Sequence, residues 1–174
     1  MEHRPDDLRI TVNNARTILE NREPPDDQHS VMCVYISMSP SFASHVSWTI
    51  FSDETATSFV LRRIEWNKPF DLQRFRNPMV GLKYGWHTAP AISSQIAELS
   101  QETIQTFIDE AQNMTISEPT NRGITLDGTR WSIFVDKAFN NKVKSWNTEP
   151  PEWKALIEWT SRLIRFIDDF TEIE

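Results

Sequence analysis

The chain has 174 residues and a net charge of −7, with 39% hydrophobic and 25% charged residues. This size and balance are typical of one globular domain and exclude a disordered chain. Cys33 is the only cysteine, which excludes an intramolecular disulfide and a cysteine-rich zinc site.

Residues 7–22 are predicted to form a helix, because an apolar stripe recurs at helical spacing. The alternating residues 8–12 compete with that interpretation and favour a strand. A polar loop rich in proline and aspartate follows, so residues 1–30 are interpreted as a helix plus a loop. The stripe consists of Leu8, Val12, Ala15 and Leu19.

Three β-branched, apolar segments come next, at residues 31–38, 45–52 and 56–66. Their close spacing favours an antiparallel meander. Alternating apolar residues at 79–86 indicate either a fourth strand or a loop.

Residues 92–114 are predicted to be helical, with Ser100 as a possible cap. Asp127-Gly128 favours a two-residue hairpin turn. A second turn at Asn140-Asn141 would pair Val135 with Trp146, although it would also oppose two lysines, so a longer loop stays open as an alternative.

The last element begins at residues 148–151, where prolines suit a first helical turn. Its apolar residues follow a helical repeat to the end of the chain. The sequence therefore predicts a single α+β domain over residues 1–174. We expect an antiparallel sheet of about five to seven strands, with helices packed on one face and a long C-terminal amphipathic helix.

No catalytic or cofactor signature is apparent. The four glycines form no phosphate-binding loop, and the four histidines lack neighbours at metal-site spacing. Cys33 lies in an apolar run that indicates a core position. The adjacent carboxylate pairs are interpreted as solvated acids. We therefore predict no cofactor, no metal and no catalytic residues, and a non-enzymatic role is favoured.

Cationic and aromatic residues alternate within residues 62–76, in a chain that is otherwise acidic. The segment 62–86 has six basic and two acidic side chains, a surplus of +4 that leaves −11 on the remainder. Such a mixture can contact an anionic protein surface or, less favoured, bind nucleic acid weakly. Alternatively, the rings pack inward and the cations balance the acids of the chain. The candidate interaction residues are Arg63, Trp66, Lys68, Arg74 and Arg76.

Residues 84–87 place Trp86 and His87 next to the flexible Gly85. This segment is interpreted as a strand end that packs Tyr84 and Trp86 inward or, alternatively, as a recognition loop or pocket. The pocket alternative would make the protein a small hydrolase or ligand-binding domain.

Four of the seven tryptophans lie within residues 124–159. Trp131, Trp146 and Trp153 are predicted to form the seam between a hairpin and the last helix. Trp159 lies at the edge of the apolar arc, aligned with Phe166 and Phe170. Either a neighbouring loop covers that edge, or these three residues form a partner contact or a homodimer.

A small acidic interaction protein is the predicted function, in concrete form an inhibitor or immunity-type partner of a basic protein. The predicted partner is another protein. Nucleic acid is a less favoured partner because of the net negative charge. No apolar run reaches the roughly 18 residues of a membrane span, and the N-terminus lacks the apolar block of a secretory signal. The expected location is cytoplasmic, with no membrane partner.

Overall fold

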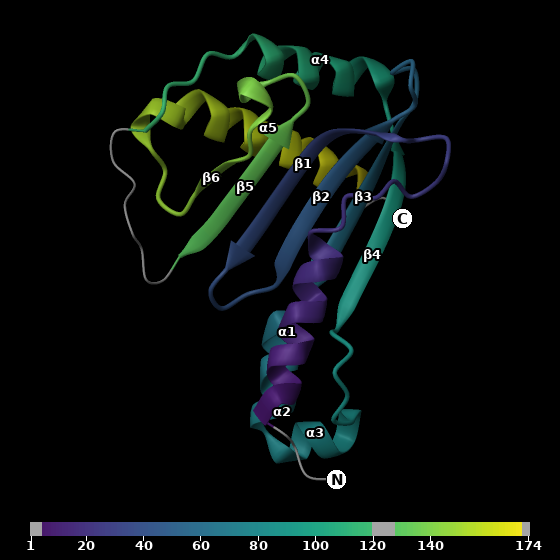
Figure 1. The fold of residues 1–174 in the computed structure, drawn as a ribbon, viewed down its shortest axis with the longest axis vertical. Helices are drawn as coiled ribbons and strands as arrows, with labels where there is room; N and C mark the ends of the chain where they lie inside the picture. The colour runs from purple at the N-terminus through teal and green to yellow at the C-terminus, as the bar shows by residue number, and fades with distance from the viewer. Residues whose placement is uncertain (1–4, 120–127, 172–174) are drawn as a thin grey trace.

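The computed structural model describes residues 5–119 and 128–171, which form one antiparallel sheet with helices on both of its faces (Figure 1). The strand order within the described residues is β4-β3-β2-β1-β5-β6. Every neighbouring pair is antiparallel. The strands are β1 (Val31–Pro40), β2 (His45–Ser52), β3 (Phe59–Trp66), β4 (Ile92–Leu99), β5 (Thr129–Val135) and β6 (Lys144–Trp146).

The helices occupy three places around this sheet (Figure 1). α4 and α5 cover one face, α1 crosses part of the other face, and α2 and α3 lie beyond the end of the strands. The α+β prediction, including the long C-terminal helix, is confirmed. α1 was not foreseen on the second face. The bounds are α1 (Pro5–Leu19), α2 (Lys68–Arg76), α3 (Pro78–Tyr84), α4 (Gln101–Asn113) and α5 (Lys154–Thr171), with 3-10 turns at Phe139–Asn141 and Pro151–Trp153.

The main hydrophobic core lies between the sheet and the pair α4 and α5. Strand positions two residues apart point into it, as at Trp48 and Ile50 of β2, because successive strand residues face opposite sides. α5 contributes a fully buried stripe at helical spacing. That stripe consists of Leu156, Trp159, Leu163 and Ile167.

Three tryptophans form the predicted seam at one end of this core. Trp131 pairs with Trp146 across β5 and β6, and their rings stack with centroids 6.3 Å apart. The ring of Trp153 meets Trp146 edge-on at 6.0 Å. The seam is therefore confirmed. The tight-turn register that paired Val135 with Trp146 is wrong, and the longer loop is the one found.

That longer loop uses left-handed backbone. Lys137, Phe139, Asn140 and Asn141 all have φ values between 53° and 59°. Asn tolerates this region better than most residues. The Asn141 side chain also accepts a hydrogen bond from the Lys137 amide at 2.8 Å, which closes the loop. Sequence spacing alone could not reveal this irregular connection.

Two other predicted elements differ in the structure. Residues 79–86 were predicted as a strand or loop but lie largely in helix α3, where Pro78 occupies the first turn and the Asn77 side chain accepts from the Met79 amide at 3.0 Å. Residues 92–99 were predicted as helix but form β4, paired with β3 along its whole length. Pairing with a buried neighbour outweighed the local helical pattern. The predicted Asp127-Gly128 turn includes residue 127, which lies outside the described residues.

The second face of the sheet is covered only in part. Ala15 and Leu19 of α1 pack against Ile64 and Trp66 of β3. The loop after α1 continues this cover, because the Arg62 guanidinium donates to the Glu23 carbonyl at 2.7 Å. Among the described residues, no helix lies in front of β1, β5 and β6 on this side (Figure 1). The described part of the chain therefore leaves half of this sheet face uncovered.

Candidate functional site

A groove with a volume of about 560 Å³ lies on the open half of the sheet, beside α1. Its floor is a row of serines that the strand register sets side by side, and we call it the serine groove. Ser37 of β1 pairs with Ser132 of β5, which pairs with Ser145 of β6. The hydroxyls of Ser132 and Ser145 lie 2.9 Å apart. Because serine is small, the floor is recessed and its hydroxyls can donate or accept hydrogen bonds.

The row next to the serine row holds four different side chains. His45 pairs with Trp66 across β2 and β3, and Ser39 pairs with Arg130 across β1 and β5. Ser39, His45 and Arg130 line the groove. The sheet register therefore places a hydroxyl, an imidazole and a guanidinium at one end of the groove.

The wall of the groove is formed by the end of α1 and the residues after it. Arg16, Glu20 and Arg22 lie there. The guanidinium of Arg22 stacks over the ring of Tyr35 at 4.7 Å. With Arg130 on the floor, the lining of the groove has three arginines and one carboxylate, a local excess of positive charge in an acidic protein.

Two of the groove arginines lack a counter-ion among the described residues. Neither Arg16 nor Arg130 forms a salt bridge with any carboxylate in the part of the chain that the structure describes. By contrast, Arg63 reaches Glu65 at 2.8 Å and Arg162 reaches Glu110 at 2.6 Å. The groove thus offers positive charge that is available to a ligand.

Behind Ser39 lies a polar cluster of His45 and Lys68. The Ser39 hydroxyl oxygen is 3.2 Å from each ring nitrogen of His45. The Lys68 ammonium is 3.2 Å from Nε2 of the same ring and 2.9 Å from the Ser41 carbonyl. Burial, followed by the positive charge of Lys68, lowers the pKa of His45 to about 4. The imidazole is therefore neutral at pH 7.

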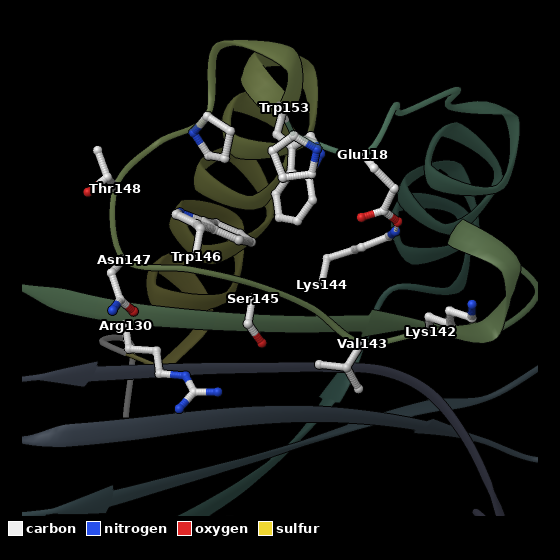
Figure 2. A pocket seen from close by; sticks show the side chains of 12 residues that line it. Glu118, Arg130, Lys142, Val143, Lys144, Ser145, Trp146, Asn147, Thr148 and Trp153 are labelled. Carbon is white, nitrogen blue, oxygen red and sulfur yellow. Dashed lines mark hydrogen bonds and ion pairs between the residues drawn. The ribbon is translucent and has the colours of Figure 1, made fainter. Parts of the chain in front are cut away.

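A second pocket of about 840 Å³ continues around strand β6 (Figure 2). Arg130, Val143 and Ser145 line both it and the serine groove. Figure 2 shows Lys144 and Glu118 pointing toward one another, and their charged groups lie 2.7 Å apart.

The candidate residues of segment 62–76 do not gather on one surface. Trp66 and Arg74 are each 1% exposed. Arg74 forms an ion pair with Asp71 at 3.0 Å, and the indole of Trp66 donates to the same carboxylate at 2.7 Å. Arg63 is paired with Glu65, whereas Arg76 is exposed. Of these candidate residues, only Lys68 lies near the serine groove, behind Ser39 and His45.

Trp86 and His87 lie at the α3 end of the molecule, away from the serine groove. The ring of Trp86 packs against Gly81, where an added Cβ would overlap ring atoms, and its centroid is 6.4 Å from that of Phe75. His87 is exposed and contacts the Arg74 guanidinium at 2.9 Å. Neither residue lines the groove, the β6 pocket or the two smaller pockets.

The apolar edge of α5 is covered by α4. Trp159 is fully buried and donates its indole hydrogen to the Phe107 carbonyl at 3.0 Å. Phe166 is half-buried, with its ring 5.9 Å from that of Phe107. The side chain of Phe170 lies outside the described residues. α4, rather than a loop, therefore covers Trp159, and this ring is not available at the surface.

The serine groove was not predicted from the sequence. Its only signal is that Ser37, Ser39 and Ser132 alternate with apolar residues along two segments. Such alternation indicates an outward-facing strand surface. The alignment of segments about 95 residues apart, which makes a site of these serines, depends on the β1–β5 register.

The described residues contain no group of three or more His, Cys, Asp or Glu side chains placed to hold a metal ion. Among them, no helix has the length and apolar character needed to cross a membrane. No protein-family model, curated protein or solved structure matches the chain.

Proposed function

We propose that the protein is a non-enzymatic interaction protein that binds an acidic segment of another protein in the serine groove. The observation that carries this proposal is the unpaired positive charge of the groove. Arg16 and Arg130 border the serine floor with no carboxylate partner among the described residues. An anionic segment would supply the missing counter-charge, and a groove of this kind strengthens the attraction of oppositely charged ligands.

The shape of the groove also supports an extended protein segment as the ligand. The floor spans β1, β5 and β6, so it is wide and open rather than enclosed. The serine side chains are short enough to let a partner backbone approach the sheet. Their hydroxyls can pair with backbone amides and carbonyls of the partner. Arginine is enriched at protein interfaces, which agrees with a contact role for the groove arginines.

The charge distribution around the groove would orient the partner. The net charge of −7 repels an acidic partner elsewhere on the surface, while the groove attracts it. Such complementarity mainly accelerates association and selects the docking site. Binding of this kind weakens as salt rises, because ions screen exposed charges.

The experiment is an affinity titration with two decapeptides, one rich in glutamate and one rich in lysine. We expect the glutamate-rich peptide to bind the wild-type chain, and Arg130→Glu to weaken that binding at least tenfold. Arg76→Glu is the matched control, because Arg76 is exposed at the end of α2 and makes the same charge change. Equal affinities of the two variants for this peptide would overturn the proposal.

A second candidate contact surface is acidic and consists of the loop 23–29 and the β2–β3 turn. Its charge favours the inhibitor or immunity-type role toward a basic protein. His29 bonds to Asp26 at 3.0 Å and to Ser58 at 3.0 Å, which brings the loop 23–29 beside the β2–β3 turn. That turn carries Asp53 and Glu54. Hydrogen bonds from Thr57 lower the pKa of Asp53 to about 2. This role predicts instead that the lysine-rich peptide binds and that Glu54→Gln lowers the affinity for that peptide.

A further inference from the structure

The cluster behind Ser39 has a defined direction of hydrogen bonding, which follows from the charge of Lys68. A lysine ammonium has three donors and no acceptor. Three acceptors surround this one: the Ser41 carbonyl at 2.9 Å, Nε2 of His45 at 3.2 Å and the Pro40 carbonyl at 3.4 Å. Each N–H of Lys68 has its own acceptor only when Nε2 carries a lone pair, and this favours that form of the ring.

The proton of the neutral imidazole then resides on Nδ1. The alternative tautomer would let Nε2–H donate to the Pro40 carbonyl at 3.1 Å. That arrangement would turn an N–H toward the Lys68 ammonium, with two positively polarised hydrogens facing each other. Lys68 disfavours it for the same reason that a nearby positive charge disfavours protonation of the ring.

Ser39 is consequently an acceptor toward His45 and a donor toward the groove. With the proton on Nδ1, the ring donates to the Ser39 oxygen at 3.2 Å. Nε2 also lies 3.2 Å from this oxygen, but its single lone pair accepts from Lys68, so the hydroxyl hydrogen of Ser39 is left for a ligand. Hydrogen bonds in a chain polarise one another, so the charge of Lys68 makes this hydroxyl a stronger donor.

We infer that Ser39 and Arg130 form an oxyanion subsite of the serine groove, in which Lys68 and His45 act as positioning residues that direct the Ser39 hydroxyl toward a carboxylate or phosphate group. Ser39 and Arg130 are paired across β1 and β5 and line the same groove. A hydroxyl donor beside a guanidinium matches the oxygens of such a group. This inference rests on the proposed function in treating the groove as the contact surface, and it specifies the chemical group recognised there.

The first test is the tautomer of His45, which does not depend on any ligand. Long-range ¹H–¹⁵N NMR of the wild-type chain at pH 7 should show Nδ1 protonated and Nε2 unprotonated. In Lys68→Met the ring should shift toward the Nε2–H tautomer, whereas Lys68→Arg, which keeps the charge, should restore the Nδ1–H form. A protonated Nε2 in the wild type would overturn the inference.

The second test is a titration with inorganic phosphate and, separately, acetate, followed by backbone amide shifts. We expect Ser39→Ala to weaken binding of the preferred anion about tenfold, the effect of one charge-assisted hydrogen bond. Ser132→Ala is the matched control, because it removes a floor hydroxyl that has no contact with His45, and it should change affinity less than threefold. Tighter binding of phosphate would assign a phosphorylated source, and tighter binding of acetate an acidic side chain.

The outcomes also separate this inference from the proposed function. If anion binding requires Ser39 but the glutamate-rich peptide does not bind, the subsite stands and the proposed function fails. If the peptide binds but Ser39→Ala and Ser132→Ala have equal effects on anion binding, the proposed function stands and the subsite is overturned.

Discussion

The two faces of the sheet are built from the same strands but have different roles. On the face toward α4 and α5, Ile36 and Ile133 are at most 1% exposed within a continuous apolar core. Ser37 follows Ile36 in β1, and Ser132 precedes Ile133 in β5. Both serines point to the opposite face and line the groove. A step of one residue along either strand thus leads from a side chain in the core to a side chain in the serine groove. Changes on the first face should affect stability, and changes on the second should affect binding.

Trp159→Ala should have the largest effect, because it removes a fully buried ring between α4 and α5 together with its hydrogen bond to Phe107. We expect a loss of about 3–5 kcal/mol in the free energy of unfolding, measured by urea denaturation. A loss below about 1 kcal/mol would mean that α4 does not cover this side chain as described.

Asp71→Asn tests the buried polar contacts that join α2 to the sheet. Asp71 is fully buried, pairs with Arg74 and accepts the indole hydrogen of Trp66. The change leaves a buried guanidinium without its counter-ion, and we expect a loss of about 3 kcal/mol in unfolding free energy. Arg63→Gln breaks a more exposed pair and should cost less than about 1 kcal/mol. Equal losses for both variants would contradict this assignment.

His45 should make stability depend on pH. Its folded pKa of about 4 lies below the ordinary value of 6.5, so between these values the unfolded chain binds the proton more readily. Stability is therefore complete above pH 6.5 and decreases as pH falls toward 4. Because the ring is half-buried and faces the charges of Lys68 and Arg16, we expect a loss of about 1–2 kcal/mol after allowance for solvent screening.

The reference for this measurement is His45→Gln, which cannot titrate at that position. Urea denaturation of both proteins at pH 7, 5.5 and 4.5 would isolate the His45 contribution, since the other titrating groups are shared. Parallel pH profiles would show that the pKa of His45 is not lowered.

The smallest effect on stability should come from the groove floor. Ser132→Ala removes a hydroxyl that is only half-buried and contacts another serine. We expect a change within about 0.5 kcal/mol in unfolding free energy, as is usual for substitutions at such positions. A loss above 1.5 kcal/mol would mean that the serine row is part of the structural framework.

The helix-covered face was largely predictable, because burial leaves a regular pattern in the sequence. Alternation at Val46, Trp48 and Ile50 predicted β2, and helical spacing predicted α5 with its Trp159. The groove was not predictable, since it arises from the register between β1 and β5, which no local pattern encodes. Trp66 packs inward, as the alternative for this segment expected, whereas the burial of the candidate Arg74 could not be predicted. Their hydrogen bond and ion pair with Asp71 depend on how α2 folds back onto β3.

The central claim is that the open face of the sheet is the binding face. Its most direct test is to add the glutamate-rich decapeptide to ¹⁵N-labelled protein and map the amide resonances that shift. We predict shifts along β1 and β5 at Ser37, Ser39 and Ser132, and at Arg16 and Arg22 beside them, with α4 and α5 unaffected. Shifts confined to the helix-covered side or to the β2–β3 turn, with none in the serine groove, would contradict the claim.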